Sequence, residues 1–279
     1  MAVRFLVGDS FELSADVEGL WNGKPVLLLH GGGQTRYSWG NTMSVLGEAG
    51  FLAINLDLRG HGYSDWAADG NYSIDAYAKD LRTVVDLIGQ PVALVGASLG
   101  GLASLIAAGE APQVVCSALI LVDVAPQLEQ VGRERILEFM RSYPDGFISL
   151  EEAASAVSGY LPYRSRPDDL SGLENNLRLG FDGRYRWHWD PAIISDDEQV
   201  NDKFDTKRYE RAALTIDVPI MLVRGRMSDV VSKAGAQAFL KTVPSAEYVD
   251  VKEAGHMIAG DRNDAFTSAV ISFLTKNLS

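Results

Sequence analysis

The chain has one cysteine and few basic residues relative to acidic ones. Cys116 is the only cysteine among 279 residues, so no internal disulfide can form and one chain cannot assemble a cysteine-based metal cluster. Cys116 lies in the apolar run VVCSALILV, which favours a buried thiol. We therefore expect no structural metal and no redox framework.

Basic charge is also scarce, with 25 basic against 37 acidic residues and a formal net charge of −12. Such a chain offers no basic field for a phosphate backbone or an anionic membrane surface. The start, MAVRFLVGDSFEL, lacks the apolar core and cleavage site of a signal peptide, and no apolar run approaches the roughly 18 residues of a membrane span. We expect a cytoplasmic protein with a small-molecule substrate, and neither nucleic acid nor a membrane as partner.

Short apolar runs alternate with helix-length segments along most of the chain. The runs RFLV and FELSADVEG alternate apolar and polar residues, which predicts an antiparallel pair near the N-terminus. Continuous apolar runs predict buried parallel strands at Val26–Leu29, Leu52–Leu56, Val92–Val95, Ala118–Val122 and Ile220–Val223. The fold class predicted is α/β, a mostly parallel central sheet flanked by helices on both faces.

This alternation stops between Pro126 and Thr206. The segment is helical in pattern, charged and aromatic, with no convincing strand. Ser149 and Glu152 form a capping box before one apolar helical pattern, and Pro162 marks its end. We predict that residues 1–125 and 207–279 form the α/β core and that residues 126–206 are an inserted helical lid.

The most specific motif is Gly96-Ala97-Ser98-Leu99-Gly100, a G-x-S-x-G. It directly follows a predicted strand and opens a predicted helix, which is the context of a nucleophile elbow. Glycines two positions on either side of the serine let strand and helix approach closely. The pattern predicts Ser98 as a nucleophile at a helix N-terminus, where backbone N–H groups stabilise negative charge.

A serine hydroxyl needs a base to accept its proton, and the chain has four histidines. His30 lies beside three glycines and His61 in a tight turn, where we expect structural hydrogen bonds. His188, between two tryptophans, fits packing or substrate contact better than catalysis. His256 lies between the last predicted strand and helix, where a loop at the sheet's carboxyl edge can deliver an imidazole to Ser98. His256 is the predicted base.

The third group of a serine triad is an acid that orients the base. Asp229 follows a predicted strand end and lies between Ser98 and His256 in chain order. Asp123, at the end of the strand ALILVD, is the alternative acid because it also lies at a carboxyl strand edge. Asp229 is the predicted acid.

The run Leu29-His30-Gly31-Gly32-Gly33-Gln34 follows the first buried strand and offers unhindered backbone N–H groups. Such a loop suits an oxyanion hole. Three glycines can also cradle a phosphate, but the G-K-[ST] and GxGxxG patterns and an acidic ribose partner are missing. A nucleotide role is therefore disfavoured.

The motifs LLLHGGG, LDLRGHGYSD, VGASLGG, LVRGRMSDVV and EAGHM, in that order, resemble the signature series of the α/β-hydrolase superfamily. The resemblance implies Ser98 as nucleophile, Gly32 and Leu99 N–H groups as oxyanion hole, Asp229 as acid and His256 as base. It also implies that residues 57–62 are a structural turn. Serine at the elbow departs from the epoxide hydrolases and haloalkane dehalogenases, which carry aspartate there.

The expected function is hydrolysis of a small carboxylic ester or related acyl compound through an acyl-enzyme, without cofactor or metal. The aromatic residues of the predicted lid favour a mostly apolar pocket, with Tyr160 and Trp187 as candidate lining residues beside Tyr163 and Trp189. Two alternatives stay open: a carbon–carbon bond hydrolase with the same triad, and a slow-turnover receptor for a small ligand on the same fold.

Overall fold

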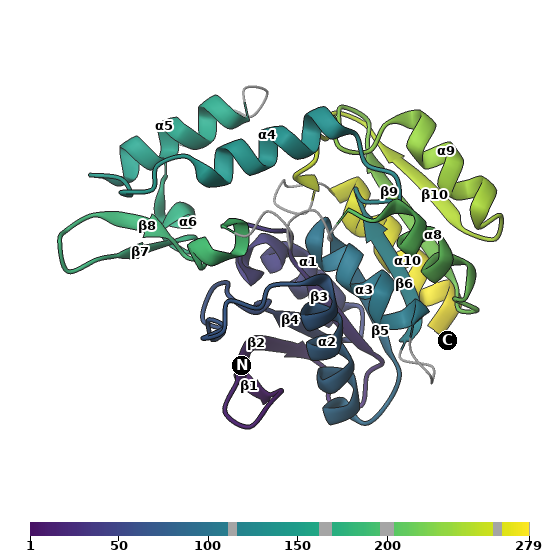
Figure 1. Ribbon diagram of the computed structural model, residues 1–279. Coiled ribbons are helices and arrows are strands. Elements are labelled where there is room, and N and C mark those ends of the chain that lie inside the picture. Colours follow the sequence, from purple (N-terminus) through teal and green to yellow (C-terminus); the bar gives the residue numbers. More distant parts are fainter. Residues whose placement is uncertain (111–115, 162–168, 196–203, 259–263, 279) are drawn as a thin grey trace.

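A central eight-stranded sheet organises the protein (Figure 1). The computed structural model describes residues 1–278 except 111–115, 162–168, 196–203 and 259–263. The strands lie in the order β1-β2-β4-β3-β5-β6-β9-β10. Their bounds are β1 Ala2–Leu6, β2 Glu12–Gly19, β3 Pro25–Leu29, β4 Leu52–Leu56, β5 Val92–Ala97, β6 Cys116–Val122, β9 Ile220–Gly225 and β10 Glu247–Val251. β2 is antiparallel to both neighbours and the remaining pairs are parallel, so the predicted fold class is confirmed.

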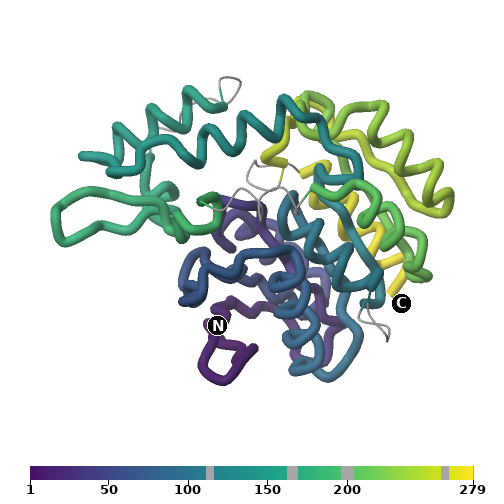
Figure 2. The backbone as a smooth tube through the Cα atoms, viewed as in Figure 1, coloured from purple at the N-terminus to yellow at the C-terminus, as the bar shows by residue number. Residues whose placement is uncertain are grey.

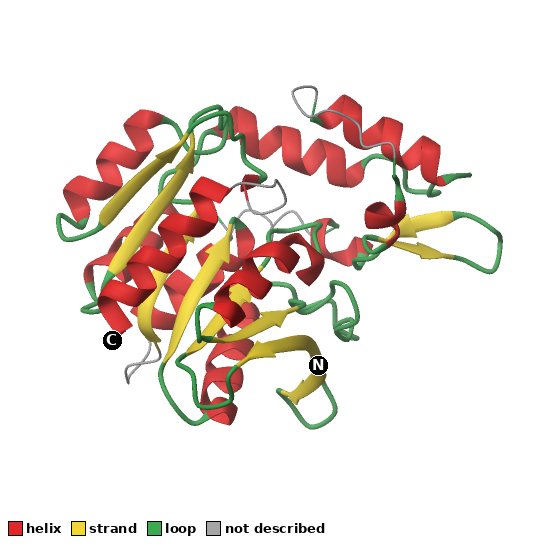
Figure 3. Ribbon diagram, turned by 180° about the vertical axis from the view of Figure 1, so that it is seen from behind, coloured by secondary structure: helices red, strands yellow, loops and turns green. Residues whose placement is uncertain are grey.

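Helices cover both faces of this sheet (Figures 1 and 3). Their bounds are α1 Gly40–Glu48, α2 Ile74–Ile88, α3 Leu99–Gly109, α8 Thr206–Leu214, α9 Lys233–Thr242 and α10 Asp264–Leu278. Successive side chains of a strand point to opposite faces. Leu27 and Leu29 of β3 accordingly pack into the core with α2, α3, α8 and α9, whereas Val26 and Leu28 pack with α1 and α10. A strand buried on both faces needs the continuous apolar run seen in the sequence.

The ends of α2 illustrate how local sequence sets the helices. The Ser73 hydroxyl accepts a hydrogen bond from the Ala76 N–H and caps the N-terminus. Gly89 ends the helix in the left-handed region at φ 77°, which glycine adopts without steric cost. The helix therefore begins and ends where its sequence dictates.

The described parts of residues 126–206 lie together on one side of the central sheet (Figures 1 and 2). Their described elements are α4 Gln130–Arg141, α5 Leu150–Tyr160, α6 Ser171–Glu174, β7 Leu177–Leu179, β8 Tyr185–Trp187 and the 3₁₀ turn η2 Pro191–Ile194. The prediction that this segment holds no strand is wrong, because β7 and β8 form an antiparallel hairpin. Ser149 caps α5, as the sequence predicts. Pro162 and Tyr163 lie outside the described residues.

The part of the chain that the structure describes contains no helix long and apolar enough to cross a bilayer. It also contains no group of three histidine, cysteine or acidic side chains placed to hold a metal ion. Cys116 is a buried free thiol, and burial raises its pKa to about 12. The thiol is therefore protonated and unreactive at neutral pH.

Candidate active site

Ser98 occupies the turn between β5 and α3 with φ 46° and ψ −115°, a backbone conformation that costs a non-glycine residue free energy. A Cβ on Gly96 would lie 2.5 Å from the Gly100 carbonyl oxygen, and a Cβ on Gly100 would lie 2.5 Å from the Leu29 carbonyl oxygen. Both glycines of the motif are therefore required by close backbone packing. The Ser98 N–H donates to the Val122 carbonyl at 3.2 Å, which ties the elbow to the neighbouring strand.

The glycine loop after β3 lies against this elbow. A Cβ on Gly31 would lie 3.3 Å from the Ser98 Cβ, and one on Gly32 would lie 3.8 Å from Leu99 Cδ2. The Gly31 N–H donates to the Gln34 side chain in the same loop, and the Gly33 N–H donates to His61. Among the described residues, the N–H groups of Gly32 and Leu99 have no acceptor. These two N–H groups, which the sequence analysis assigns to an oxyanion hole, are thus available to a ligand oxygen.

Gln34 is a member of the site that the sequence does not reveal. Its Oε1 accepts the Gly31 N–H at 2.8 Å and its Nε2 donates to Met257 Sδ at 3.0 Å. The residue is 9% exposed. Gln34 therefore joins the glycine loop to the loop that carries His256, a contact across 223 residues of chain that no local pattern signals.

The imidazole of His256 is held by Asp123. His256 Nδ1 lies 2.7 Å from Asp123 Oδ2, and the carboxylate is fully buried. The same carboxylate accepts the Gly225 N–H at 2.9 Å and the Ser228 hydroxyl. With every oxygen partnered, the carboxylate is fixed, and its bond to Nδ1 leaves His256 Nε2 without a proton in the neutral ring.

The prediction that Asp229 holds the base is corrected by this geometry. Asp229 Oδ2 lies 3.0 Å from Arg135 Nη1, and its side chain is 32% exposed. Asp123 directly follows β6, the strand between β5 and β9, so its carboxylate is placed by the sheet itself. Asp229 lies four residues beyond the end of β9, and its loop directs the Ser228 hydroxyl to Asp123 while its own carboxylate turns to α4. The alternative acid is the one in contact with His256.

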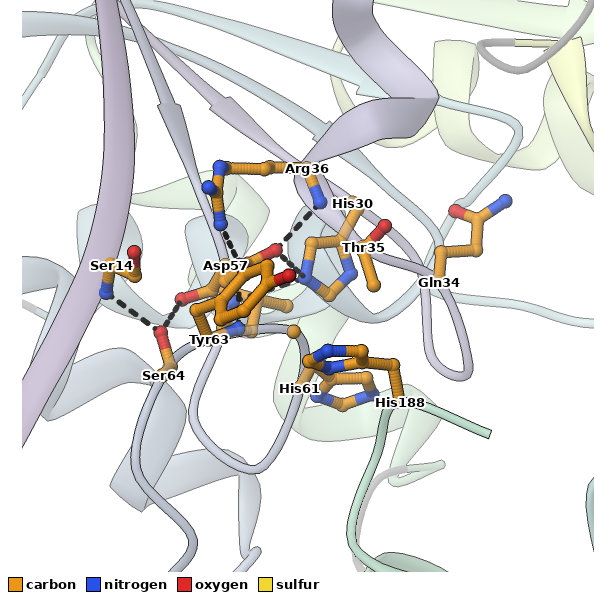
Figure 4. Close-up of polar contacts among 12 residues, drawn as sticks. Ser14, His30, Gln34, Thr35, Arg36, Asp57, His61, Tyr63, Ser64 and His188 are labelled. Carbon is orange, nitrogen blue, oxygen red and sulfur yellow. Dashed lines mark hydrogen bonds and ion pairs between the residues drawn. The ribbon is translucent and has the colours of Figure 1, made fainter. Parts of the chain in front are cut away.

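His30 has a structural environment (Figure 4). Its Nδ1 lies 2.8 Å from the Gly31 carbonyl oxygen, and its Nε2 accepts the Leu58 N–H at 3.0 Å. Burial lowers the pKa of His30, so the ring is neutral. Nearby, the Asp57 carboxylate accepts the N–H groups of Arg36 and Tyr63. Asp57 therefore holds residues 57–62 in place, the segment for which the sequence resemblance implies a structural turn.

The other two histidines are also engaged within the protein. His61 Nε2 accepts the Gly33 N–H at 3.1 Å, and Nδ1 lies 2.9 Å from the Arg59 carbonyl oxygen. His188 is buried against Tyr63, receives a hydrogen bond from Arg178, and has its pKa lowered by burial. Both residues are labelled in Figure 4. His61 thus supports the glycine loop, whereas His188 anchors the segment above it.

Ser98 and His256 line one cavity of about 140 Å³. The walls are mostly apolar and come from the loops after β3 and β5, from α4 and from η2. Tyr160 lines this cavity, and burial raises its pKa. Trp187 does not; it stands against Phe139 and lines a neighbouring cavity of about 380 Å³ that Tyr160 also borders. The tryptophan in the Ser98 cavity is Trp189.

Comparison with known proteins finds that this chain is similar to hydrolases. The sequence profile described as "alpha/beta hydrolase fold" matches residues 24–262. "Esterase Rv0045c" of Mycobacterium tuberculosis is 30% identical over 264 residues, which cover 90% of this chain and 83% of that protein. A solved structure of that esterase superposes with a TM-score of 0.77 at 26% identity, covering 99% of this chain and 92% of the other. The crystal structure of E-2-(acetamidomethylene)succinate hydrolase superposes with a TM-score of 0.85 at 22% identity and covers 99% of both chains.

Fold and site together define the class as α/β hydrolase. The chain belongs to the alpha/beta hydrolase fold family, and its relatives include esterases and other hydrolases.

Proposed function

We propose that the protein is a serine hydrolase that cleaves a small carboxylic ester or related acyl compound through an acyl-enzyme, with Ser98 as nucleophile, His256 as base and Asp123 as orienting acid. The observation that carries the proposal is the 2.7 Å contact between Asp123 Oδ2 and His256 Nδ1, in a cavity that His256 shares with Ser98. The 30% identical esterase supports the reaction type.

In the acylation step, His256 Nε2 takes the Ser98 hydroxyl proton as Oγ attacks the ester carbonyl carbon. The carbonyl oxygen becomes an oxyanion that accepts hydrogen bonds from the Gly32 and Leu99 N–H groups. The buried Asp123 carboxylate stabilises the imidazolium, which then protonates the leaving alcohol. Ser98 and Asp123 act from positions that backbone hydrogen bonds to neighbouring strands fix.

In the deacylation step, His256 removes a proton from water, which attacks the acyl carbon. The second oxyanion forms in the same N–H pair, and Ser98 leaves with the proton from His256. Residues 126–206 act as the lid over this chemistry, because α4 and η2 supply apolar walls to the cavity. Apolar walls limit bulk water around the reacting carbonyl.

The test uses p-nitrophenyl esters of increasing acyl length, with lactones and 1,3-diketones alongside. We expect steady turnover and an initial burst of p-nitrophenol for an ester, and neither with Ser98→Ala. A fluorophosphonate should label Ser98 once per chain. Turnover restricted to diketones would instead assign a carbon–carbon bond hydrolase, and ligand binding without turnover of any compound would assign a receptor.

A further inference from the structure

The Ser98 cavity carries a cationic side chain that the proposed reaction does not use. Arg133 of α4 lines this cavity and is partly buried. The other cavity-lining residues include no carboxylate among those that the structure describes. An arginine on an apolar wall has given up part of its hydration, and a ligand anion would restore that interaction.

Arg133 differs in this respect from the other described arginines of residues 126–206. Arg135 pairs with Asp229, and Arg186 pairs with Asp182. The remaining arginines donate to carbonyl oxygens: Arg141 to Ile194, Arg178 to Gly62 and Arg184 to Asp145 and Gly146. Within the described part of this segment, only the Arg133 guanidinium has no oxygen partner.

The guanidinium of Arg133 is nevertheless held in place. Its central carbon lies 4.6 Å from the centre of the Phe204 ring, which also lines the cavity. Stacking on an aromatic face orients the guanidinium plane and leaves its N–H edge open to a planar anion. A carboxylate fits that edge with two parallel hydrogen bonds.

The position of Arg133 along α4 separates it from the glycine loop. Arg133, Ile136, Leu137 and Met140 are spaced to share one helix face, and all four line the cavity. Met140 lies at the glycine loop, with Sδ 3.5 Å from where a Gly33 Cβ would stand. At 1.5 Å per residue, Arg133 is about 10 Å farther along the helix axis. That spacing suits an acyl chain of several methylenes.

We propose that the substrate's acyl group ends in a carboxylate that Arg133 binds, so that the enzyme acts on half-esters of short dicarboxylic acids. The acyl group stays attached to Ser98 during the reaction and must therefore occupy the cavity that Ser98 lines. The neighbouring cavity borders Gly33 and Met257 without reaching Ser98. Hydrolysis of the half-ester rests on the proposed function, whereas binding of the carboxylate by Arg133 does not.

The test compares monomethyl adipate with the methyl ester of adipic monoamide, which differ in charge at equal length. For the wild type, we expect kcat/KM to be about 10- to 100-fold higher for the acid, as charge-assisted hydrogen bonds allow. Arg133→Met should abolish that preference, so that the acid and the amide are hydrolysed with similar kcat/KM. Arg4→Met removes an equal charge from β1, where Arg4 pairs with Glu12, and should retain the preference.

A binding measurement separates this inference from the proposed reaction. Calorimetry on Ser98→Ala should show the same 10- to 100-fold preference for the acid, and Ser98→Ala with Arg133→Met should show none. Charge preference absent from Ser98→Ala, or unchanged by Arg133→Met, overturns the anion site. Wild-type protein that binds the acid through Arg133 but hydrolyses neither ester would keep the anion site and refute the hydrolase mechanism.

Discussion

Asp123 Oδ2 lies 2.7 Å from His256 Nδ1, although 133 residues separate them in the chain. Asp123 directly follows β6, and its own N–H donates to the Val223 carbonyl at 2.7 Å. The carboxylate is therefore positioned by the sheet, and the histidine loop folds back to meet it. This contact favours Asp123 over Asp229 as the acid that orients His256.

Asp123→Asn should lower kcat by about 10⁴-fold, because an amide no longer enforces the tautomer that presents a bare Nε2 to Ser98. Asp229→Asn should change kcat less than about threefold, since its partly exposed ion pair with Arg135 contributes little. Both variants are assayed on one ester after circular dichroism shows that they are folded. The reverse ranking would return the role of acid to Asp229.

Ser98→Gly should unfold at a higher denaturant concentration than Ser98→Ala. The backbone at φ 46° strains alanine as it strains serine, whereas glycine adopts it freely. We expect a difference of about 1 kcal/mol in the free energy of unfolding, measured by urea titration of the two inactive variants. Equal stabilities would mean that the elbow stores no strain.

Gln34→Met should lower kcat about tenfold and leave KM within a factor of two. Without Oε1, the Gly31 N–H loses its acceptor, and the neighbouring Gly32 N–H is no longer held in a fixed orientation. The oxyanion is then stabilised less, whereas binding of the ground-state substrate is unchanged. Met257→Leu is the control, because it removes the sulfur contact to Gln34 and keeps an apolar side chain of similar size in the cavity wall. A rise in KM at constant kcat for Gln34→Met, or an equal loss of kcat in Met257→Leu, would argue against this role.

Stability should fall as the pH drops from 7.5 to 5.5. Burial lowers the pKa of His30 in the folded state below its ordinary 6.5. Below about pH 6.5, His30 binds a proton in the unfolded chain but not in the folded chain. The free energy of unfolding therefore falls by up to about 1.4 kcal/mol per pH unit for one such group. Urea unfolding of the wild type and of His30→Gln checks this. The variant should show a shallower pH dependence, and parallel curves would assign the loss to other groups such as His188.

Much of the fold was predictable because its signals are local. A strand buried on both faces must be apolar throughout, so β3, β4 and β5 stand out as runs of residues. The elbow stands out because only glycine fits at positions 96 and 100, two residues before and two residues after Ser98. Local sterics therefore predict where Ser98 lies.

The acid was not predictable in the same way. Asp123 and Asp229 both follow parallel strands, and chain order allows either. Which of the two carboxylates reaches His256 depends on the number of residues between the strand end and the aspartate, and on the side chains near it. Asp229 pairs with Arg135 of α4 instead. The hairpin β7–β8 was missed because three-residue strands carry too few residues for a period to show. For the same reason, the sequence could not show whether Trp187 or Trp189 lines the Ser98 cavity, because the direction of each side chain depends on that hairpin.

The backbone attachments of the elbow bear on how this protein can change. Ser98 N–H and Asp123 N–H each bond to a carbonyl of the next strand in the sheet, so these two groups share the rigidity of the core. His256 alone among the three stands on a loop. Substitutions that alter β5 or β6 must disturb folding and chemistry together, whereas those in α4 or around Met257 can reshape recognition without that penalty. Selection for new substrates should therefore accumulate changes in the latter regions, and the sheet should drift slowly.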